Sequence, residues 1–87
     1  EINIPHLHMS VAYINPNKVL EEVKNVFKED GPIEGSWIEM TPVPWDRYSY
    51  HTDVYYGGIT RVEDGERVQY EFIVDAHKGT LMNLYRV

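Results

Sequence analysis

The sequence predicts an α+β domain in which one helix packs against a three- to four-stranded antiparallel sheet. Three observations support this prediction: an amphipathic helical pattern over residues 16–30, alternating apolar and polar residues over 68–74, and turn signals between the later apolar runs. With 87 residues the chain has room for one small core, so we expect a single domain over residues 1–87, with the sheet in residues 36–87. Burying the apolar stripe of the helix against one sheet face gives two layers.

The N-terminal part is expected to hold a strand or an extended arm, followed by the helix. Polarity alternates within residues 1–14, from Leu7 to Tyr13. The helix is predicted over residues 15–31, because Asn15 can cap free amides and Pro16 fits the first helical position, where its missing N–H would be unpaired anyway. One apolar stripe of helical period consists of Val19, Leu20, Val23, Val26 and Phe27.

The middle of the chain is expected to form the first strands of the sheet. A short strand is predicted over residues 37–41, and the Pro42-Val43-Pro44 segment is predicted to end it, because proline cannot donate to a strand ladder. A second alternating run covers residues 46–56. The Gly57-Gly58 pair follows, and we interpret it as a bulge inside one long strand.

Two hairpins are predicted at the end of the chain. Asp64-Gly65 between alternating runs is a strong two-residue hairpin signal, and counting outward from it places Gly57 opposite Phe72. In the next turn Asp75 can accept backbone amides, and Gly79 can adopt the positive φ that a short loop often needs. A final strand then returns to the end of the chain.

The composition restricts the classes of function. The formal net charge is −6, from 14 acidic and 8 basic residues, so binding to nucleic acid or to an anionic membrane surface is disfavoured. The chain has no cysteine, which removes disulfides, thiol catalysis and cysteine-ligated zinc. No apolar stretch is long enough to cross a bilayer, so we expect no direct membrane insertion of this segment.

No residue set predicts an active site, and we expect a protein that is not an enzyme and holds no cofactor. Ser49, His51 and Asp53 match the residue types of a hydrolase triad, but side chains on one strand face stand about 6.7 Å apart instead of pointing at one another. We therefore interpret them as an exposed polar strand face. The alternative is a small-ligand or metal-binding domain that uses His6, His8 and His51, although two or three histidines alone are more often surface residues.

Aromatic residues form the most suggestive set in the sequence. Trp45 lies between Pro44 and Asp46 in a predicted loop and has no periodic reason to be buried. An exposed Trp beside Tyr residues is typical of a protein-contact anchor, while core packing and carbohydrate stacking use the same residue types. The predicted partner-binding residues are Trp37, Trp45, Tyr48, Tyr50 and Tyr55.

The end of the chain resembles a known family. Residues 70–81 are similar to the close of a PepSY-type domain, in which an alternating apolar strand runs into an Asp, a short spacer, a Gly and another strand. Asp75 and Gly79 occupy those positions, and the helix at residues 17–29 sits where that family places its helix. The resemblance implies a helix on an antiparallel sheet, as in half of a β-lactamase-inhibitor-type fold, with a cystatin-like arrangement as the alternative.

The resemblance also implies a function and a setting. PepSY-type domains occur in bacterial secreted, lipid-anchored and protease-propeptide proteins, are non-enzymatic, and are thought to bind or restrain peptidases. We therefore expect a protein-binding or inhibitory module outside the cytoplasm. We also expect a monomer or weak homodimer, because an exposed strand edge could pair two copies. A cytoplasmic location is the alternative, which the lack of disulfides slightly favours. Because residue 1 is Glu, we expect a processed or excised chain, from which a signal peptide or anchor could have been removed.

Overall fold

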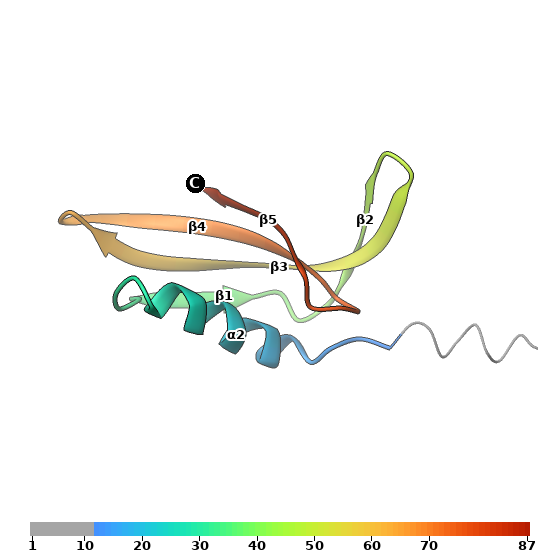
Figure 1. Cartoon of the computed structure of the whole chain (residues 1–87), viewed down its shortest axis with the longest axis horizontal. Coiled ribbons are helices and arrows are strands. Elements are labelled where there is room, and N and C mark those ends of the chain that lie inside the picture. The colour runs from blue at the N-terminus through green and yellow to red at the C-terminus, as the bar shows by residue number, and fades with distance from the viewer. Residues whose placement is uncertain (1–11) are drawn as a thin grey trace, which may run out of the picture.

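A computed structural model describes residues 12–87 and confirms the α+β class. Within this part, one helix, α2 (Pro16–Lys28), accompanies an antiparallel sheet of five strands, where three or four were expected (Figure 1). No helix among the described residues is long and apolar enough to span a membrane. The strands are β1 (Gly35–Ile38), β2 (Val43–Arg47), β3 (Tyr50–Glu63), β4 (Glu66–Asp75) and β5 (Leu81–Arg86).

Most of the predicted N-terminal strand, residues 7–13, lies outside the described residues. The described residues 12–15 belong to no strand. They are attached to the rest of the domain by a hydrogen bond from the Ile14 amide to the Ala76 carbonyl, at 2.8 Å. This segment therefore connects to the turn between β4 and β5 before the helix begins.

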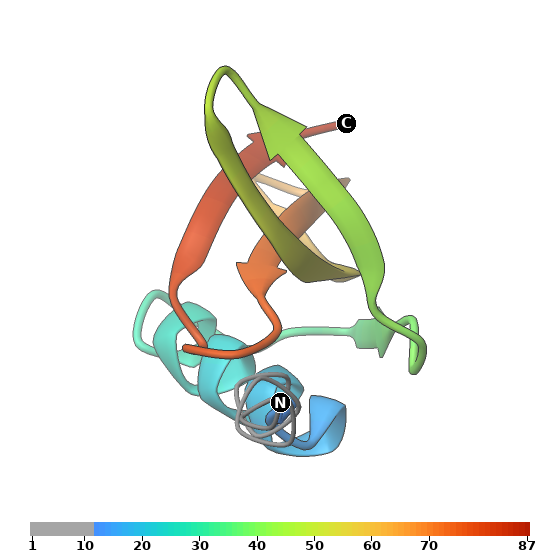
Figure 2. The ribbon, with the colours of Figure 1, turned by 90° about the vertical axis from the view of Figure 1, so that its right-hand side faces the viewer.

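The sheet is built around β3 and β4, its two longest strands. The strand order is β1-β3-β4-β5, and β2 also pairs with β3. Strand β1 pairs with residues 57–60 of β3, and β2 pairs with residues 50–54, so the two short strands follow one another along the same edge. The hairpin of β2 and β3 curls away from α2, as Figure 2 shows.

Helix α2 starts where the sequence predicts. The Asn15 side chain accepts a hydrogen bond from the Asn17 amide at 2.8 Å, and Pro16 is the first helical residue. The helix ends at Lys28, slightly earlier than predicted, and a turn leads to Gly31 with a φ of 134°. Only glycine adopts such a conformation without strain, so the chain leaves the helical path here.

The core lies between α2 and one face of the sheet. The predicted stripe supplies Val19 and Phe27, which are 2% and 8% exposed. The sheet contributes residues that alternate along β3 and β4, as the period-2 pattern predicts. The buried cluster consists of Val19, Phe27, Tyr55, Ile59, Phe72, Val74 and Ala76.

Arg61 joins the end of the helix to the sheet. Its Nη1 donates to the Phe27 carbonyl at 3.2 Å, and its guanidinium lies 5.1 Å from the Phe27 ring centroid. Its Nε donates to the Glu63 carboxylate at 2.7 Å, and the Tyr70 hydroxyl donates to the same oxygen at 2.7 Å. The Tyr70 hydrogen bond and the Arg61 contact lower the pKa of Glu63, so this cluster is held in its charged form.

The short strand predicted over residues 37–41 is present as β1, which begins two residues earlier and ends at Ile38, so no strand crosses Pro42, as predicted. The loop predicted around Trp45 is wrong, because β2 begins at Val43 and includes Trp45. Pro44 is tolerated because β2 pairs only with β3 among the described strands, and an edge position needs no N–H on its outer side.

The run over residues 46–56 is not one strand, because a hairpin turn interrupts it at Tyr48 and Ser49. Tyr48 has a φ of 57°, which is uncommon for a residue other than glycine, asparagine or aspartate. The turn contains no Gly, Asn or Pro, and Ser49 alone is of a type common in turns, so the local signal is weak. The pairing of β2 with β3, more than the residues of the turn, therefore determines its position.

The predicted bulge at Gly57-Gly58 is also wrong, while the predicted register is confirmed. Gly57 pairs with Phe72 and Gly58 with Glu71, in a stretch of β3 and β4 without irregularity. A Cβ at Gly57 would overlap the Phe72 ring and come 2.7 Å from the Trp37 carbonyl oxygen. A Cβ at Gly58 would overlap the Trp37 indole on the other face of the sheet. The two glycines let one aromatic ring lie against the backbone on each face.

The two later hairpin turns are confirmed. Asp64 and Gly65 have φ angles of 52° and 83°, as the two central residues of a type I′ turn require. Gly79 has a φ of 78°, so the positive φ predicted there is present. Both turns are local features, which explains why the sequence predicts them well.

We expect the two glycines to differ in how strongly alanine destabilises the domain. Gly57→Ala should lower the free energy of unfolding by about 3 kcal/mol, because its Cβ meets a fully buried ring and a backbone carbonyl. Gly58→Ala should cost about 1 kcal/mol, because the Trp37 side chain is exposed enough to swing away. Urea unfolding followed by circular dichroism measures both.

Gly35→Ala is the matched control for these variants. No atom lies within 4 Å of the Cβ that it would add in β1, so its stability should equal that of the wild type. Equal losses for Gly57→Ala and Gly35→Ala would contradict the close approach of the Phe72 ring.

Candidate functional site

The sheet has one face against α2 and one face that points away from it, which we call the open face. Tyr55 and Ile59 of β3 belong to the helix-facing core, so the even-numbered residues of β3 lie on the open face. Residues that pair across neighbouring strands share a face. The register therefore places these larger side chains on the open face: Trp37, Val43, Trp45, Tyr50, Tyr56 and Tyr85.

Three aromatic side chains of the open face are well exposed. Trp37 is 45% exposed, and Tyr50 and Tyr85 are each 41% exposed. The Tyr85 hydroxyl donates to the Glu71 carboxylate at 2.8 Å, which fixes the ring beside β4. The Trp45 ring is half-buried and meets Tyr50 edge-on, with 6.3 Å between the ring centroids. The open face is thus an aromatic surface on a paired, rigid sheet.

The structure places four of the five predicted contact residues at the surface and removes the fifth. Trp37, Trp45 and Tyr50 lie on the open face, and Tyr48 is 97% exposed at the tip of the hairpin of β2 and β3. Tyr55 is a correction, because it is only 2% exposed and faces the helix. The odd position of Tyr55 in β3 could have shown that it lies on the other face from Tyr50 and Tyr56. Sequence reasoning also missed one exposed aromatic residue, Tyr85.

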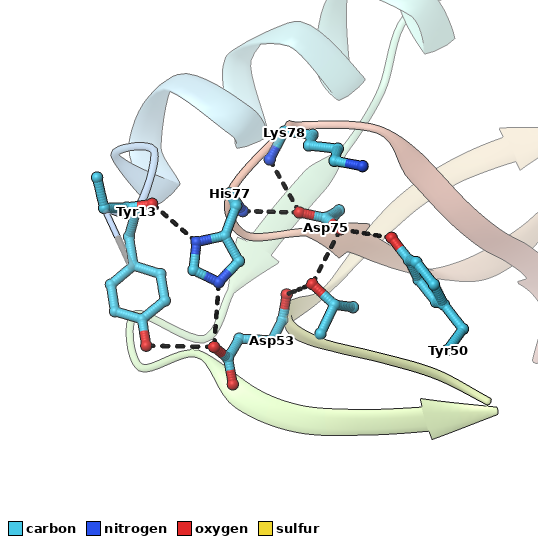
Figure 3. A network of polar contacts seen from close by, with 8 residues as sticks. Tyr13, Tyr50, Asp53, Asp75, His77 and Lys78 are labelled. Carbon is cyan, nitrogen blue, oxygen red and sulfur yellow. Dashed lines mark hydrogen bonds and ion pairs between the residues drawn. The ribbon is translucent and has the colours of Figure 1, made fainter. Parts of the chain in front are cut away.

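A polar network at the base of the curled hairpin joins three segments of the chain, as Figure 3 shows. At its centre is Asp75, which is 1% exposed. One oxygen of its carboxylate accepts the backbone amides of His77 and Lys78, each at 2.8 Å. The other accepts the hydroxyls of Thr52 at 3.0 Å and Tyr50 at 3.2 Å. The carboxylate therefore connects the β4–β5 turn to the start of β3.

The hydrogen bonds determine the charge state of Asp75. Burial by itself raises the pKa of a carboxyl group, but four donated hydrogen bonds outweigh it here and leave the pKa of Asp75 below its ordinary value. Because every acceptor position that faces the protein is used, the group is a structural anion and offers no free atom for general acid or base chemistry.

His77 holds the segment that precedes the helix. Its Nδ1 lies 2.8 Å from the Ala12 carbonyl oxygen, and its Nε2 lies 3.1 Å from an Asp53 carboxylate oxygen. The Tyr13 ring stacks on the imidazole at 4.9 Å between centroids, and the Tyr13 hydroxyl donates to Asp53 at 3.4 Å. We call these contacts the His77 latch. Asp75 is the other charged group near the ring.

The latch is best satisfied by a doubly protonated ring. Neutral imidazole carries one N–H, whereas both nitrogens of His77 face acceptors, so only the imidazolium donates to both. The hydrogen bond to the Ala12 carbonyl, together with Asp53, raises the pKa of His77 against the opposing effect of burial. The latch therefore attaches residues 12–14 to the sheet most firmly in acid.

The residues of the considered triad are not arranged for catalysis. His51 pairs with Asp46 at 2.7 Å, and Asp53 pairs with His77. No hydrogen bond joins His51 to Ser49 within residues 12–87, so no base is positioned to activate that hydroxyl. The two His–Asp pairs line a shallow hollow of about 350 Å³ beside Pro44 and Thr52.

The described residues contain no group of three or more histidine or carboxylate side chains that could hold a metal ion. His51 is exposed and already paired with a carboxylate. His6 and His8, the other two candidates, lie outside the described residues. The metal-binding alternative therefore stays a prediction that depends on the N-terminal histidines.

Comparison with known proteins gives this domain a family. The chain is 44% identical over 72 residues to the uncharacterized protein YtzB of Bacillus subtilis (strain 168), and the match covers 83% of this chain and 69% of YtzB. The chain belongs to the YtzB family. The YtzB relative is bacterial, in agreement with the bacterial origin expected from the sequence. No family model and no solved structure matches the chain.

The latch predicts a pH dependence of stability. Because the pKa of His77 is raised on folding, its contribution should be complete below about pH 6.5, the ordinary pKa of histidine, and should be lost as the pH rises through the folded-state value. The difference in free energy of unfolding between wild type and His77→Gln should therefore shrink from pH 6 to pH 9. Urea unfolding at a series of pH values measures it.

His51→Gln is the matched control, because it removes a histidine that is 70% exposed and lies outside the latch. If His77→Gln and His51→Gln gave the same pH profile, the latch would not be the cause of the dependence.

The metal-binding alternative makes a separate prediction. If His6, His8 and His51 form a site, Zn²⁺ or Ni²⁺ should raise the melting temperature of the chain, because a ligand that binds only the folded state stabilises it. The rise should vanish in the His6→Ala, His8→Ala variant. An unchanged melting temperature of the wild type at millimolar metal ion would end this interpretation.

Proposed function

We propose that this YtzB-family domain is a non-catalytic protein-binding module that contacts its partner through the open face. The observation that carries the proposal is the set of exposed aromatic side chains on that face, above all Trp37, Tyr50 and Tyr85. Several exposed aromatic side chains on one face of a small domain mark an interaction site more often than scattered single residues do. Tyr and Trp also dominate the binding energy of protein interfaces.

The arrangement of Trp37 supports a role as the central anchor. Its indole rests on the backbone at Gly58, which leaves one side of the ring open to solvent. A ring held in this way loses little conformational freedom when a partner covers it, so more of the contact energy appears as affinity. The curled hairpin of β2 and β3 adds Trp45 and Tyr50 at one end of the same face.

The partner that fits this surface is a protein with an apolar patch bordered by basic groups. The domain carries a formal charge of −6, and the acidic side chain of Glu71 contacts Tyr85 on the open face. Opposite charge at the rim of an interface speeds association and sets orientation. A secreted or envelope-bound peptidase is the class of partner that we propose, and an inhibitory effect on it is the proposed action.

The fold relationship behind this choice is a PepSY-like arrangement outside the cytoplasm, similar to half of a β-lactamase-inhibitor-type fold. It is supported by the order of one helix followed by an antiparallel sheet, and by the turn in which Asp75 and Gly79 have the roles expected of them. A fold relationship alone does not specify function. The proposal therefore depends on the open face.

The proposal is tested by binding and inhibition assays with a secreted bacterial serine peptidase and a secreted bacterial metallopeptidase. The wild type should bind at least one of them saturably and slow its hydrolysis of a protein substrate. Trp37→Ser combined with Tyr85→Ser should weaken binding at least tenfold, since two exposed aromatic anchors are lost. Its melting temperature should stay within a few degrees of the wild-type value, because both side chains are exposed.

Val26→Ser is the control, because it also replaces an exposed apolar residue with serine but lies on the helix side of the domain, where Val26 is 63% exposed. It should bind as the wild type does. Loss of binding by this control to the same extent, or unchanged binding by the open-face variant, would remove the open face as the contact surface.

A further inference from the structure

The outer edge of β5 is open and unusually well suited to pairing with another strand. Strand β5 is the last in the order β1-β3-β4-β5 and pairs with β4 only, among residues 12–87. Proteins usually protect such edges with proline, lysine or very short strands. The six residues of β5 contain neither proline nor lysine, and Leu81, Leu84 and Tyr85 are exposed by 50%, 42% and 41%.

The opposite edge of the sheet is protected in the usual ways. Strand β1 has only four residues, and β2 carries Pro44 and belongs to the curled hairpin. An incoming strand would therefore find a regular ladder at β5 and not at the other edge.

The hydrogen-bond pattern shows which backbone groups of β5 point outward. The Val87 amide donates to the Gln69 carbonyl of the β4 side at 2.9 Å, so odd-numbered residues here face β4. The Leu84 amide instead donates to the side chain of its neighbour Asn83 at 2.9 Å. The Leu84 N–H thus lies at the open edge, where no backbone carbonyl receives it.

An apolar groove runs beside this edge, between α2 and β5. Helix α2 packs over β1 and β3, and so leaves the β5 side of its apolar stripe uncovered. The groove has a volume of about 260 Å³ and is lined by Val19, Val23 and Val26 of the helix and by Leu81 and Leu84 of β5. A strand added to β5 would place its helix-side residues against the open side of this groove.

We propose that the occupant is a second copy of the chain, with the two β5 strands paired antiparallel across a two-fold axis near Leu84. The occupant of the groove must be apolar and carry a basic group, because Glu22 is the charged residue in the groove lining. Strand β5 itself has this composition on its helix side, with Leu81, Leu84 and Arg86.

The positions of Arg86 and Glu22 favour antiparallel over parallel pairing of the two β5 strands. Within one copy, Arg86 pairs with Tyr70, at the end of β5 near Phe27 and Asp30 of the helix end. Glu22 also lines the groove, five residues before Phe27 along α2 and therefore farther from the Arg86 end of β5. Antiparallel pairing about Leu84 moves Arg86 of each copy away from Phe27 of the other and toward Glu22, and a two-fold axis makes the contact twice. Parallel pairing would leave both charges without this complement.

Sedimentation of the full chain from 10 to 500 μM tests the proposal. The wild type should show a concentration-dependent monomer–dimer equilibrium. Arg86→Glu and Glu22→Arg should each weaken dimerisation at least tenfold, and the double variant should recover it, because the swap restores opposite charges. Leu84→Pro should also be monomeric, since proline removes the outward N–H and leaves the bonds of β5 to β4 in place.

Arg47→Glu on β2 is the control, because it makes the same charge change at the opposite edge and should dimerise as the wild type does. Circular dichroism checks that each variant is folded. A wild type that stays monomeric at 500 μM would overturn the proposal, as would a dimer that persists in Leu84→Pro. Failure of the double variant to recover, with both single variants weakened, would overturn the antiparallel arrangement.

Discussion

The close approach of aromatic rings to β3 at Gly57 and Gly58 is the constraint on which the rest of the structure depends. Phe72 lies against the backbone on the helix side and contributes to the buried core. Trp37 lies against it on the open face. Any side chain at these two positions would push one ring outward, so the same dipeptide sets the distance of the helix layer and builds the aromatic surface. Core packing and the proposed binding surface are therefore not independent.

Long-range polar contacts hold the remaining segments around this centre. The buried Asp75 carboxylate connects the β4–β5 turn to the curled hairpin, and His77 connects the same turn to the segment before the helix. The Tyr55 hydroxyl adds a 2.7 Å hydrogen bond to the Ile14 carbonyl. A chain of this size buries a smaller fraction of its surface than a large domain does, so directional contacts help to fix how the helix and hairpin meet the sheet.

The two surfaces discussed above lie on opposite sides of the sheet. The open face has exposed aromatic residues and an acidic neighbour, whereas the β5 edge pairs with no second strand among residues 12–87 and lies beside an aliphatic groove. Pairing at β5 would extend the sheet and, with it, the open face of each copy. A dimer would therefore present two aromatic surfaces at once, which raises the apparent affinity for a partner with repeated sites.

Local patterns in the sequence determined the elements whose signals lie within a few residues: the Asn15-capped helix and the turns at Asp64-Gly65 and Asp75–Gly79. They also determined that Gly57 lies opposite Phe72, because a two-residue turn fixes the pairing register of the two strands that it joins. Only the tertiary structure decided that Pro44 lies within an edge strand, that Tyr48 forms a turn and that Asp53 meets His77. Each of these depends on a strand or segment distant in sequence, and a local pattern carries no information about a partner that only folding brings near.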